Sequence, residues 1–210
     1  FAGNEHALPV APLYDDVVQL LAQAGIAYTP TLVVAFGAAL PIFRLHAAER
    51  AHTIPKVDRW YPTGDLYERS QTRLLSFPPQ DYNDREAGLG ATAILRAGGH
   101  VALGGHGEVQ GLSNHWEMAL LAGGGMTPLE VLRVATLEGA LALGLGADLG
   151  SLEPGKLADL VVLDRDPLLD IRATTAVRYV MKGGVLYEGE TLDEVWPVAR
   201  RLARPWALVR

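Results

Sequence analysis

The sequence has 210 residues, of which 49% are hydrophobic and 20% charged, and this composition is typical of a folded chain that buries a core as one large domain or two small ones. A formal net charge of −6 argues against a surface that binds nucleic acid or an acidic membrane. The absence of cysteine excludes disulfides, thiolate metal sites and cysteine nucleophiles, and no apolar run is long enough to span a membrane.

The first elements predicted are a helix and a buried strand. Residues 13–24 have apolar side chains at helical spacing; Asp15 and Asp16 favour the positive end of a helix, and Gly25 can end it in the left-handed conformation. Residues 26–36 form a β-branched apolar run, which predicts a buried strand.

The next segment, residues 37–83, mixes prolines, glycines, aromatic side chains and charges with little periodicity. A connection of this length between regular elements is typical of a lid or a binding loop. We expect helical turns within it, near residues 43–51 and 66–75.

Helices and an apolar strand alternate in the middle of the chain. The predicted order is helix, strand, helix, helix, at residues 84–97, 100–105, 114–121 and 127–143. The last of these has a complete start signal: Thr127 as the cap, Pro128 in the first position and Glu130 closing a capping box. Apolar strands that alternate with helices predict an α/β fold with parallel strands.

The pattern changes after Gly144. Residues 157–164 and 177–187 predict strands with glycine-containing turns, and residues 192–202 predict an amphipathic helix. We therefore expect a small β unit at residues 147–190 that follows an α/β unit at 1–146, with a C-terminal helix and tail at 191–210.

Three histidines near the ends of predicted elements are the candidate functional residues. His6 precedes the first helix, His106 lies on a turn between two glycines, and His115 begins a helix. A histidine at the carboxyl end of a barrel strand can bind a divalent metal or act as an acid or base. The alternative for each is a structural role in a loop, a helix cap or the core.

The glycine-rich turn around His106 also allows a nucleotide-binding hypothesis. Gly105, Gly107 and Gly111 resemble a phosphate-cradling loop, but their spacing does not match the G-x-G-x-x-G pattern. No acidic residue for a ribose can be placed at a strand end, so this is the weaker alternative.

The motifs from Gly104 onward carry a resemblance to a known family. The segments GGHGEVQG, MTPLEVLRVAT and LGSLEPGKLADLVVLD are similar to the C-terminal part of the amidohydrolase superfamily, in particular imidazolonepropionase-like metal-dependent hydrolases. The subgroup that it most resembles is often fused behind a TolB-like β-propeller. The resemblance extends from Glu5 to about Leu192 and is weakest in residues 37–83.

This resemblance implies a fold and a site. The family has a TIM-like (β/α)8 barrel and a small β-sandwich, so the chain would supply the last three barrel strands and part of the sandwich. It implies that His6 binds a divalent metal, with zinc expected. It also places His106 where the family usually has an aspartate that binds the metal and transfers protons, which makes His106 a metal ligand and a catalytic residue. His115 becomes a candidate for substrate binding.

One part of the family pattern has no counterpart in the sequence. No two of the six histidines are two residues apart, so the His-x-His of the first barrel strand is missing. A full barrel takes about 250 residues. Together with a first residue that is Phe1 rather than Met, this predicts a fragment with an incomplete active site.

The sequence thus predicts part of a metal-dependent hydrolase that cleaves amide or peptide-like C–N bonds in a small substrate. Residues 37–83 would cover the site. The alternative is a non-catalytic half-barrel whose open edges pair with another chain or with a second copy. Neither hypothesis involves nucleic acid or a membrane.

Overall fold

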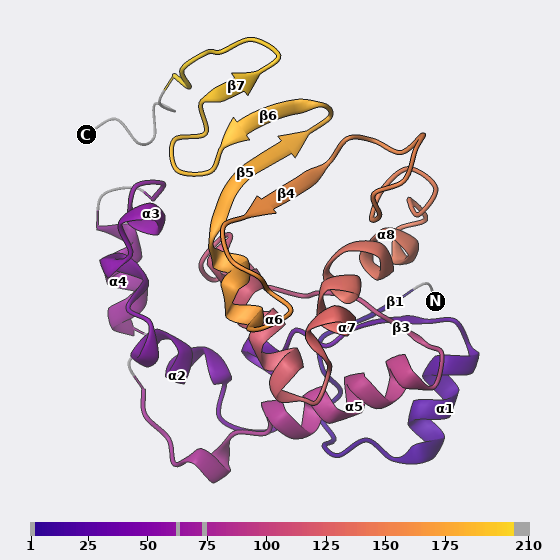
Figure 1. Ribbon diagram of the computed structural model, residues 1–210. Coiled ribbons are helices and arrows are strands. Elements are labelled where there is room, and N and C mark those ends of the chain that lie inside the picture. The colour runs from indigo at the N-terminus through magenta and orange to yellow at the C-terminus, as the bar shows by residue number, and fades with distance from the viewer. Residues whose placement is uncertain (1–2, 62–63, 73–74, 204–210) are drawn as a thin grey trace.

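Two separate β-sheets organise the molecule (Figure 1). The computed structural model of the chain describes residues 3–61, 64–72 and 75–203. The first sheet has the order β1-β2-β3 and is entirely parallel, with strands at Gly3–Glu5, Ala27–Thr29 and His100–Val101. The second has the order β4-β5-β6-β7 and is antiparallel, with strands at Leu160–Leu163, Val177–Lys182, Val185–Glu188 and Glu194–Trp196. The parallel α/β arrangement predicted for the N-terminal part is confirmed.

Helices α1 (Asp15–Gln23), α5 (Asp84–Arg96) and α6 (Leu112–Gly123) enclose the main core. Helix α5 packs against both α1 and α6, and apolar side chains of all three join one cluster with the strands. Its most buried members include Tyr28 of β2, Ile94 of α5 and Leu121 of α6. The parallel sheet contributes few residues to this core, so most of the buried apolar side chains come from the helices, turns and connecting segments around it.

The predicted start and end signals of helix α1 are confirmed. Asp15 and Asp16 occupy its first turn, where they face the positive end of the helix dipole. Gly25 follows the helix with φ +63°, the left-handed conformation that glycine adopts without steric cost.

The long strand predicted at residues 26–36 is wrong beyond Thr29. Strand β2 ends there, and Leu32–Val34 form a 3-10 turn whose side chains are buried. Pro30 has no N–H to donate to a ladder, and Thr31 has a left-handed φ of +52°. The apolar run therefore reports burial correctly, but the chain turns within it.

Residues 37–83 contain more helix than the sequence indicates. They form α2 (Pro41–Ala48), α3 (Pro55–Asp58), α4 (Asp65–Thr72) and short 3-10 turns at Ala51–Thr53 and Pro79–Asp81. The helical turns predicted near residues 43–51 and 66–75 correspond to α2 and α4, except that residues 73–74 lie outside the described residues.

The helix predicted at residues 127–143 is confirmed as an almost continuous helical segment. It consists of α7 (Pro128–Arg133), a π-helical turn at Val134–Glu138 and α8 (Gly139–Ala142). Both hydrogen bonds of the capping box are present: Thr127 Oγ1 accepts from the Glu130 N–H, and the Glu130 carboxylate accepts from the Thr127 N–H.

The C-terminal helix predicted at residues 192–202 is wrong. Strand β7 lies there and pairs with β6, because Val195 and Trp196 are strand-forming residues and Pro197 stops a helix from continuing. A bridge between Glu194 and Arg200 then turns the chain back on itself. The end of the predicted tail, residues 204–210, lies outside the described residues.

The described residues form an open parallel sheet rather than a closed barrel, with β1 and β3 as its edges. Within that part of the chain, none of the helices combines the length and the apolar character needed to cross a membrane.

Candidate functional site

The structure brings His6 and His106 together at the carboxyl edge of the parallel sheet. His6 directly follows β1, and His106 lies in the segment after β3; because the strands are parallel, both segments leave the same edge. The ring centroids of the two histidines are 5.4 Å apart, with an interplanar angle of 73°. The ring of Phe36 packs against His6 at the same centroid distance of 5.4 Å.

Both histidines have backbone conformations that side chains rarely adopt. Their φ angles are +70° at His6 and +56° at His106, in the left-handed region. Such residues cost about 1–3 kcal/mol each and are concentrated at functional sites, where the surrounding structure maintains them. Asn4 Nδ2 donates to the His6 carbonyl at 3.0 Å, which holds the first of these turns.

The two imidazoles differ in their polar surroundings. Nδ1 of His6 is buried and has no hydrogen-bond partner in the described part of the chain. Nδ1 of His106 lies 3.4 Å from a carboxylate oxygen of Glu108. A buried ring nitrogen without a partner is unusual in a native protein, and it suits a position where a ligand or an ion would bind.

These residues provide only part of a metal site. A catalytic zinc ion takes three protein ligands and keeps a fourth position for water. Within the described ranges, no group of three or more His, Cys, Asp or Glu side chains could hold a metal ion. The pair would supply at most two ligands to such an ion and would not complete its coordination.

Two glycines before His106 are required by close packing. A Cβ atom at Gly104 would collide with the Thr31 side chain, and one at Gly105 would collide with Asn114 of α6. This packing holds the His106 turn against the turn after β2 and against the start of α6. It accounts for these glycines without a bound phosphate.

His115 lies apart from this pair. It is on α6, and its Nδ1 is 2.9 Å from Thr174 Oγ1 on the 3-10 turn Ile171–Thr175. Burial lowers the pKa of His115, so the imidazole is neutral at pH 7. It lines two cavities, and neither His6 nor His106 is among the residues that line them.

Sequence reasoning missed Glu117, which is completely buried on α6. Its two carboxylate oxygens accept the N–H groups of Leu32, at 2.8 Å, and of Val33, at 3.0 Å. Burial raises the pKa of this carboxyl to about 8, against the opposing effect of the two donors. A single carboxylate inside the apolar segment WEMALL is a signal that sequence reasoning overlooked.

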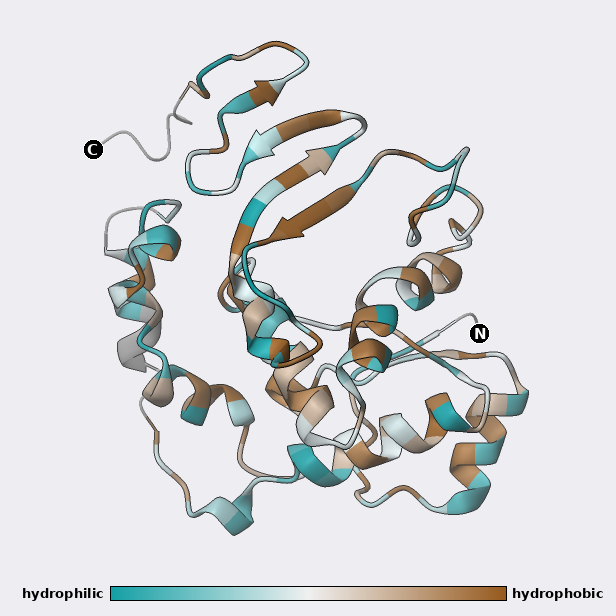
Figure 2. Ribbon diagram, viewed as in Figure 1, coloured by the Kyte–Doolittle hydropathy of each residue, from teal (hydrophilic) through white to brown (hydrophobic). Residues whose placement is uncertain are grey.

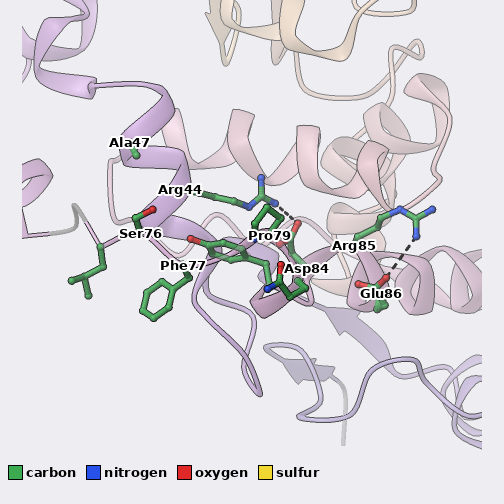
Figure 3. Close-up of a pocket in the computed structure, with 11 residues that line it drawn as sticks. Arg44, Ala47, Ser76, Phe77, Pro79, Asp84, Arg85 and Glu86 are labelled. Atoms are coloured by element: carbon green, nitrogen blue, oxygen red, sulfur yellow. Dashed lines mark hydrogen bonds and ion pairs between the residues drawn. The ribbon is translucent and has the colours of Figure 1, made fainter.

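A second feature missed from the sequence is a cavity of about 640 Å³ between α2 and the start of α5 (Figure 3). Arg44 of α2 forms an ion pair with the buried Asp84, and its guanidinium lies 5.4 Å from the centre of the Tyr82 ring. Burial raises the pKa of Asp84, although Arg44 opposes this shift. The residues involved are dispersed in the sequence, so no local motif indicates the cavity.

Comparison with known proteins agrees with the resemblance seen in the motifs. The sequence model of the amidohydrolase family matches residues 86–187. Ochratoxinase from Aspergillus niger is 44% identical over 70 residues, which cover 31% of this chain and 15% of the relative. Imidazolonepropionase from Shouchella clausii is 42% identical over 73 residues, covering 33% of this chain and 16% of the relative.

A solved structure supports the same assignment. The crystal structure of A. niger ochratoxinase superimposes with a TM-score of 0.57 at 25% identity, covering 90% of this chain and 37% of that one. The chain thus spans well under half the length of the proteins that it matches. The family match, the two enzyme relatives and this superposition agree, and together they support membership of the amidohydrolase superfamily.

Proposed function

We propose that the chain is the C-terminal part of a metal-dependent amidohydrolase that cleaves amide or peptide-like C–N bonds. The observation that carries this proposal is the His6–His106 pair at the carboxyl edge of the parallel sheet, with a centroid distance of 5.4 Å. The similarity of the chain to the amidohydrolase superfamily supports hydrolysis as the reaction class. In this proposal β1, β2 and β3 are strands of a TIM-type barrel, and the β4–β7 sheet belongs to a small sandwich.

His6 and His106 have separate roles in this proposal. His6 would hold a divalent ion, proposed to be zinc, through a ring nitrogen; its unpartnered Nδ1 supports this role. His106 would be a second ligand or would carry the proton, since imidazole can do either. When bound, such an ion supplies Lewis-acid activation of water and of the scissile carbonyl.

Residues 37–83 would cover the site and influence which substrates enter. One contact supports this role: the Tyr61 hydroxyl accepts a hydrogen bond from the backbone N–H of Gln110, four residues beyond His106. Through Tyr61, residues 37–83 are thereby connected to the loop that carries His106. Movement of a segment connected in this way would be transmitted directly to the site.

Because the pair provides fewer than three ligands, we expect the 210-residue chain alone to bind zinc weakly and to show little turnover. Equilibrium dialysis followed by elemental analysis measures the zinc bound, and hydrolysis of an Xaa-Pro dipeptide and an N-acyl amino acid measures activity. Tight stoichiometric zinc with turnover would contradict the incomplete site.

The ligand roles are tested by substitution. His6→Ala and His106→Ala should each lower the residual zinc affinity about tenfold or more. His52→Ala, at a histidine whose ring instead packs on Tyr67, is the matched control and should leave the affinity unchanged. Equal zinc binding by all three variants would show that the pair does not bind metal.

A further inference from the structure

Two cavities lie beside His115 on the side of α6 that faces α2, α3 and the second sheet. The first, here called the arginine cavity, has a volume of about 590 Å³, and the second, the aromatic cavity, about 420 Å³. The three residues that line both are Glu49, His115 and Thr175. The two cavities therefore adjoin each other at these three residues.

The arginine cavity has an excess of positive charge. Four guanidinium groups and two carboxylates line it, which leaves two positive charges in excess: Arg44, Arg85, Arg165 and Arg172 against Glu49 and Asp84. The chain as a whole has a formal charge of −6, so this local excess runs against the average. Arginines gathered in this way attract carboxylates and phosphates.

Two of these arginines have unused donors. Within the described residues, the guanidinium groups of Arg165 and Arg172 form no hydrogen bond and no ion pair, whereas Arg44 is paired with Asp84 and Arg85 with Glu86. Each free guanidinium presents five N–H donors in a planar arrangement that suits two oxygens of one anion. Arg165 and Arg172 are therefore the arginines of this cavity whose donors are available to an anion.

The aromatic cavity is mainly apolar. Its walls come from α3 and the residues around it, the start of α6, and the second sheet; they include Ile54, Val57, Trp60, Tyr61, Leu112 and Leu192. The cation in this wall, Lys56, is already engaged: it donates to the Val177 carbonyl at 3.1 Å and lies 3.4 Å from a Glu190 carboxylate oxygen. Such walls bind an apolar or aromatic group by excluding water from it.

Among the three residues that line both cavities, Glu49 and His115 already have hydrogen-bond partners. The Glu49 carboxylate accepts a hydrogen bond from Trp116 Nε1 at 2.7 Å. His115 Nδ1 is in hydrogen-bond contact with Thr174 Oγ1 at 2.9 Å. These shared residues therefore lie between a cationic cavity and an apolar cavity, and each cavity is available to a different part of one ligand.

We infer that the joined cavities bind a small amphipathic acid, with its carboxylate or phosphate at Arg165 and Arg172 and its apolar body against Trp60 and Leu112. Neither His6 nor His106 lines this site, so the inference does not depend on the hydrolytic function proposed above.

Calorimetric titration of the purified protein tests the inference. The probes are phenyl phosphate and phenylacetate, which carry both parts, and inorganic phosphate and benzyl alcohol, which carry one part each. We expect the better of the two-part probes to bind at least about tenfold more tightly than either half, and its affinity to fall as salt is added. The affinities of phenyl phosphate and phenylacetate, compared with each other, decide whether phosphate or carboxylate is the preferred head group.

The substitutions assign the contacts. Removing both free guanidiniums in Arg165→Gln/Arg172→Gln should weaken the two-part probes about tenfold or more, whereas Arg178→Gln, at an arginine that lines neither cavity, should not. Trp60→Ala should weaken the two-part probes and leave inorganic phosphate unchanged. If the double variant unfolds, the single substitutions at these exposed side chains provide the same comparison.

Several results would overturn the inference. One is the absence of binding by both two-part probes at millimolar concentration. Another is unchanged affinity in the double arginine variant. A third is equal affinity for inorganic phosphate and the better two-part probe, which would leave an anion site without an apolar part.

Discussion

Glu117 connects the two segments that surround the candidate site. Its carboxylate joins α6 to the turn at Leu32 and Val33, which follows Thr31, and Thr31 packs against Gly104 just before His106. One buried side chain thus supports the main-chain path on which His106 depends. This arrangement removes the carboxyl group from solvent, and the two N–H donors only partly offset the resulting desolvation.

The pH dependence of stability should report this carboxyl group. Its pKa is raised from an ordinary 4.5 to about 8 in the folded protein, so between these values the folded state binds more protons than the unfolded state. The contribution of the protonated Glu117 carboxyl group to the free energy of unfolding is complete below the unfolded pKa and is lost as the pH rises through about 8. Urea unfolding from about pH 5 to about pH 8 should therefore show a falling free energy of unfolding.

Glu117→Gln separates this effect from other groups. The amide has one acceptor oxygen for two N–H donors, so the variant should lose about 1–3 kcal/mol at low pH and should no longer show this part of the pH slope. Glu86→Gln, at a half-exposed glutamate of α5, is the control and should keep the slope. The same slope in the Glu117→Gln variant would assign the pH dependence to another group.

At the scale of elements, α5 and α6 cross at two glycines. A Cβ atom at Gly124 would lie 2.5 Å from the Cα of Gly88, which is too close for any side chain. The hydroxyl of Thr92 on α5 also donates to the Gly124 carbonyl at 2.7 Å. The helix pair thus comes close enough for main-chain atoms to meet, and this fixes the position of α6 and of His115 on it.

The neighbouring glycines give a matched pair of variants. Gly124→Ala must push the two helices apart and should destabilise the protein by about 1–3 kcal/mol. Gly123→Ala meets no atom within 4 Å and should change stability by less than about 1 kcal/mol. Thermal and urea unfolding of both variants measure the difference. Equal stability of the two would show that α5 and α6 have room to separate.

Local sequence signals predicted several elements correctly, but contacts between residues far apart in the sequence overrode some of these signals. The capping box at Thr127 is confirmed because all its atoms lie within one turn. The strand predicted at residues 26–36 is wrong beyond Thr29, where Glu117, 85 residues from Leu32, satisfies backbone groups that a ladder would otherwise hold. The helix predicted at residues 192–202 is wrong because pairing with β6 outweighs the apolar periodicity.

The same distinction explains the site. His6 and His106 follow strand ends, where parallel topology brings side chains together. A strand pattern precedes His106 in the sequence, whereas only the family resemblance places His6 at a strand end. The arginines beside His115 come from positions 44, 85, 165 and 172 and approach one another only through the packing of α2, α5 and the turn before β5. No spacing in the sequence contains that information.

At the scale of the whole molecule, the second sheet ends in β4, a strand of hydrophobic residues (Figure 2), two of which are exposed. Strand β4 is an end strand of that sheet and has the sequence LVVL, with Val161 56% and Val162 40% exposed. The parallel sheet is open at β1 and β3 as well. Open strand edges with apolar side chains favour pairing with another strand, so we expect this chain to associate with a second copy or with another chain.

Sedimentation velocity over a micromolar concentration range tests this expectation. The chain should form dimers or larger species, and Val161→Lys should shift the population toward monomer because a charge on an edge strand opposes pairing. Leu169→Lys removes an even more exposed apolar side chain, at 87% exposure, but from a loop, so it should leave the association unchanged. A monomeric unmodified chain would contradict association, and equal effects of both substitutions would assign it to general apolar exposure rather than to the β4 edge.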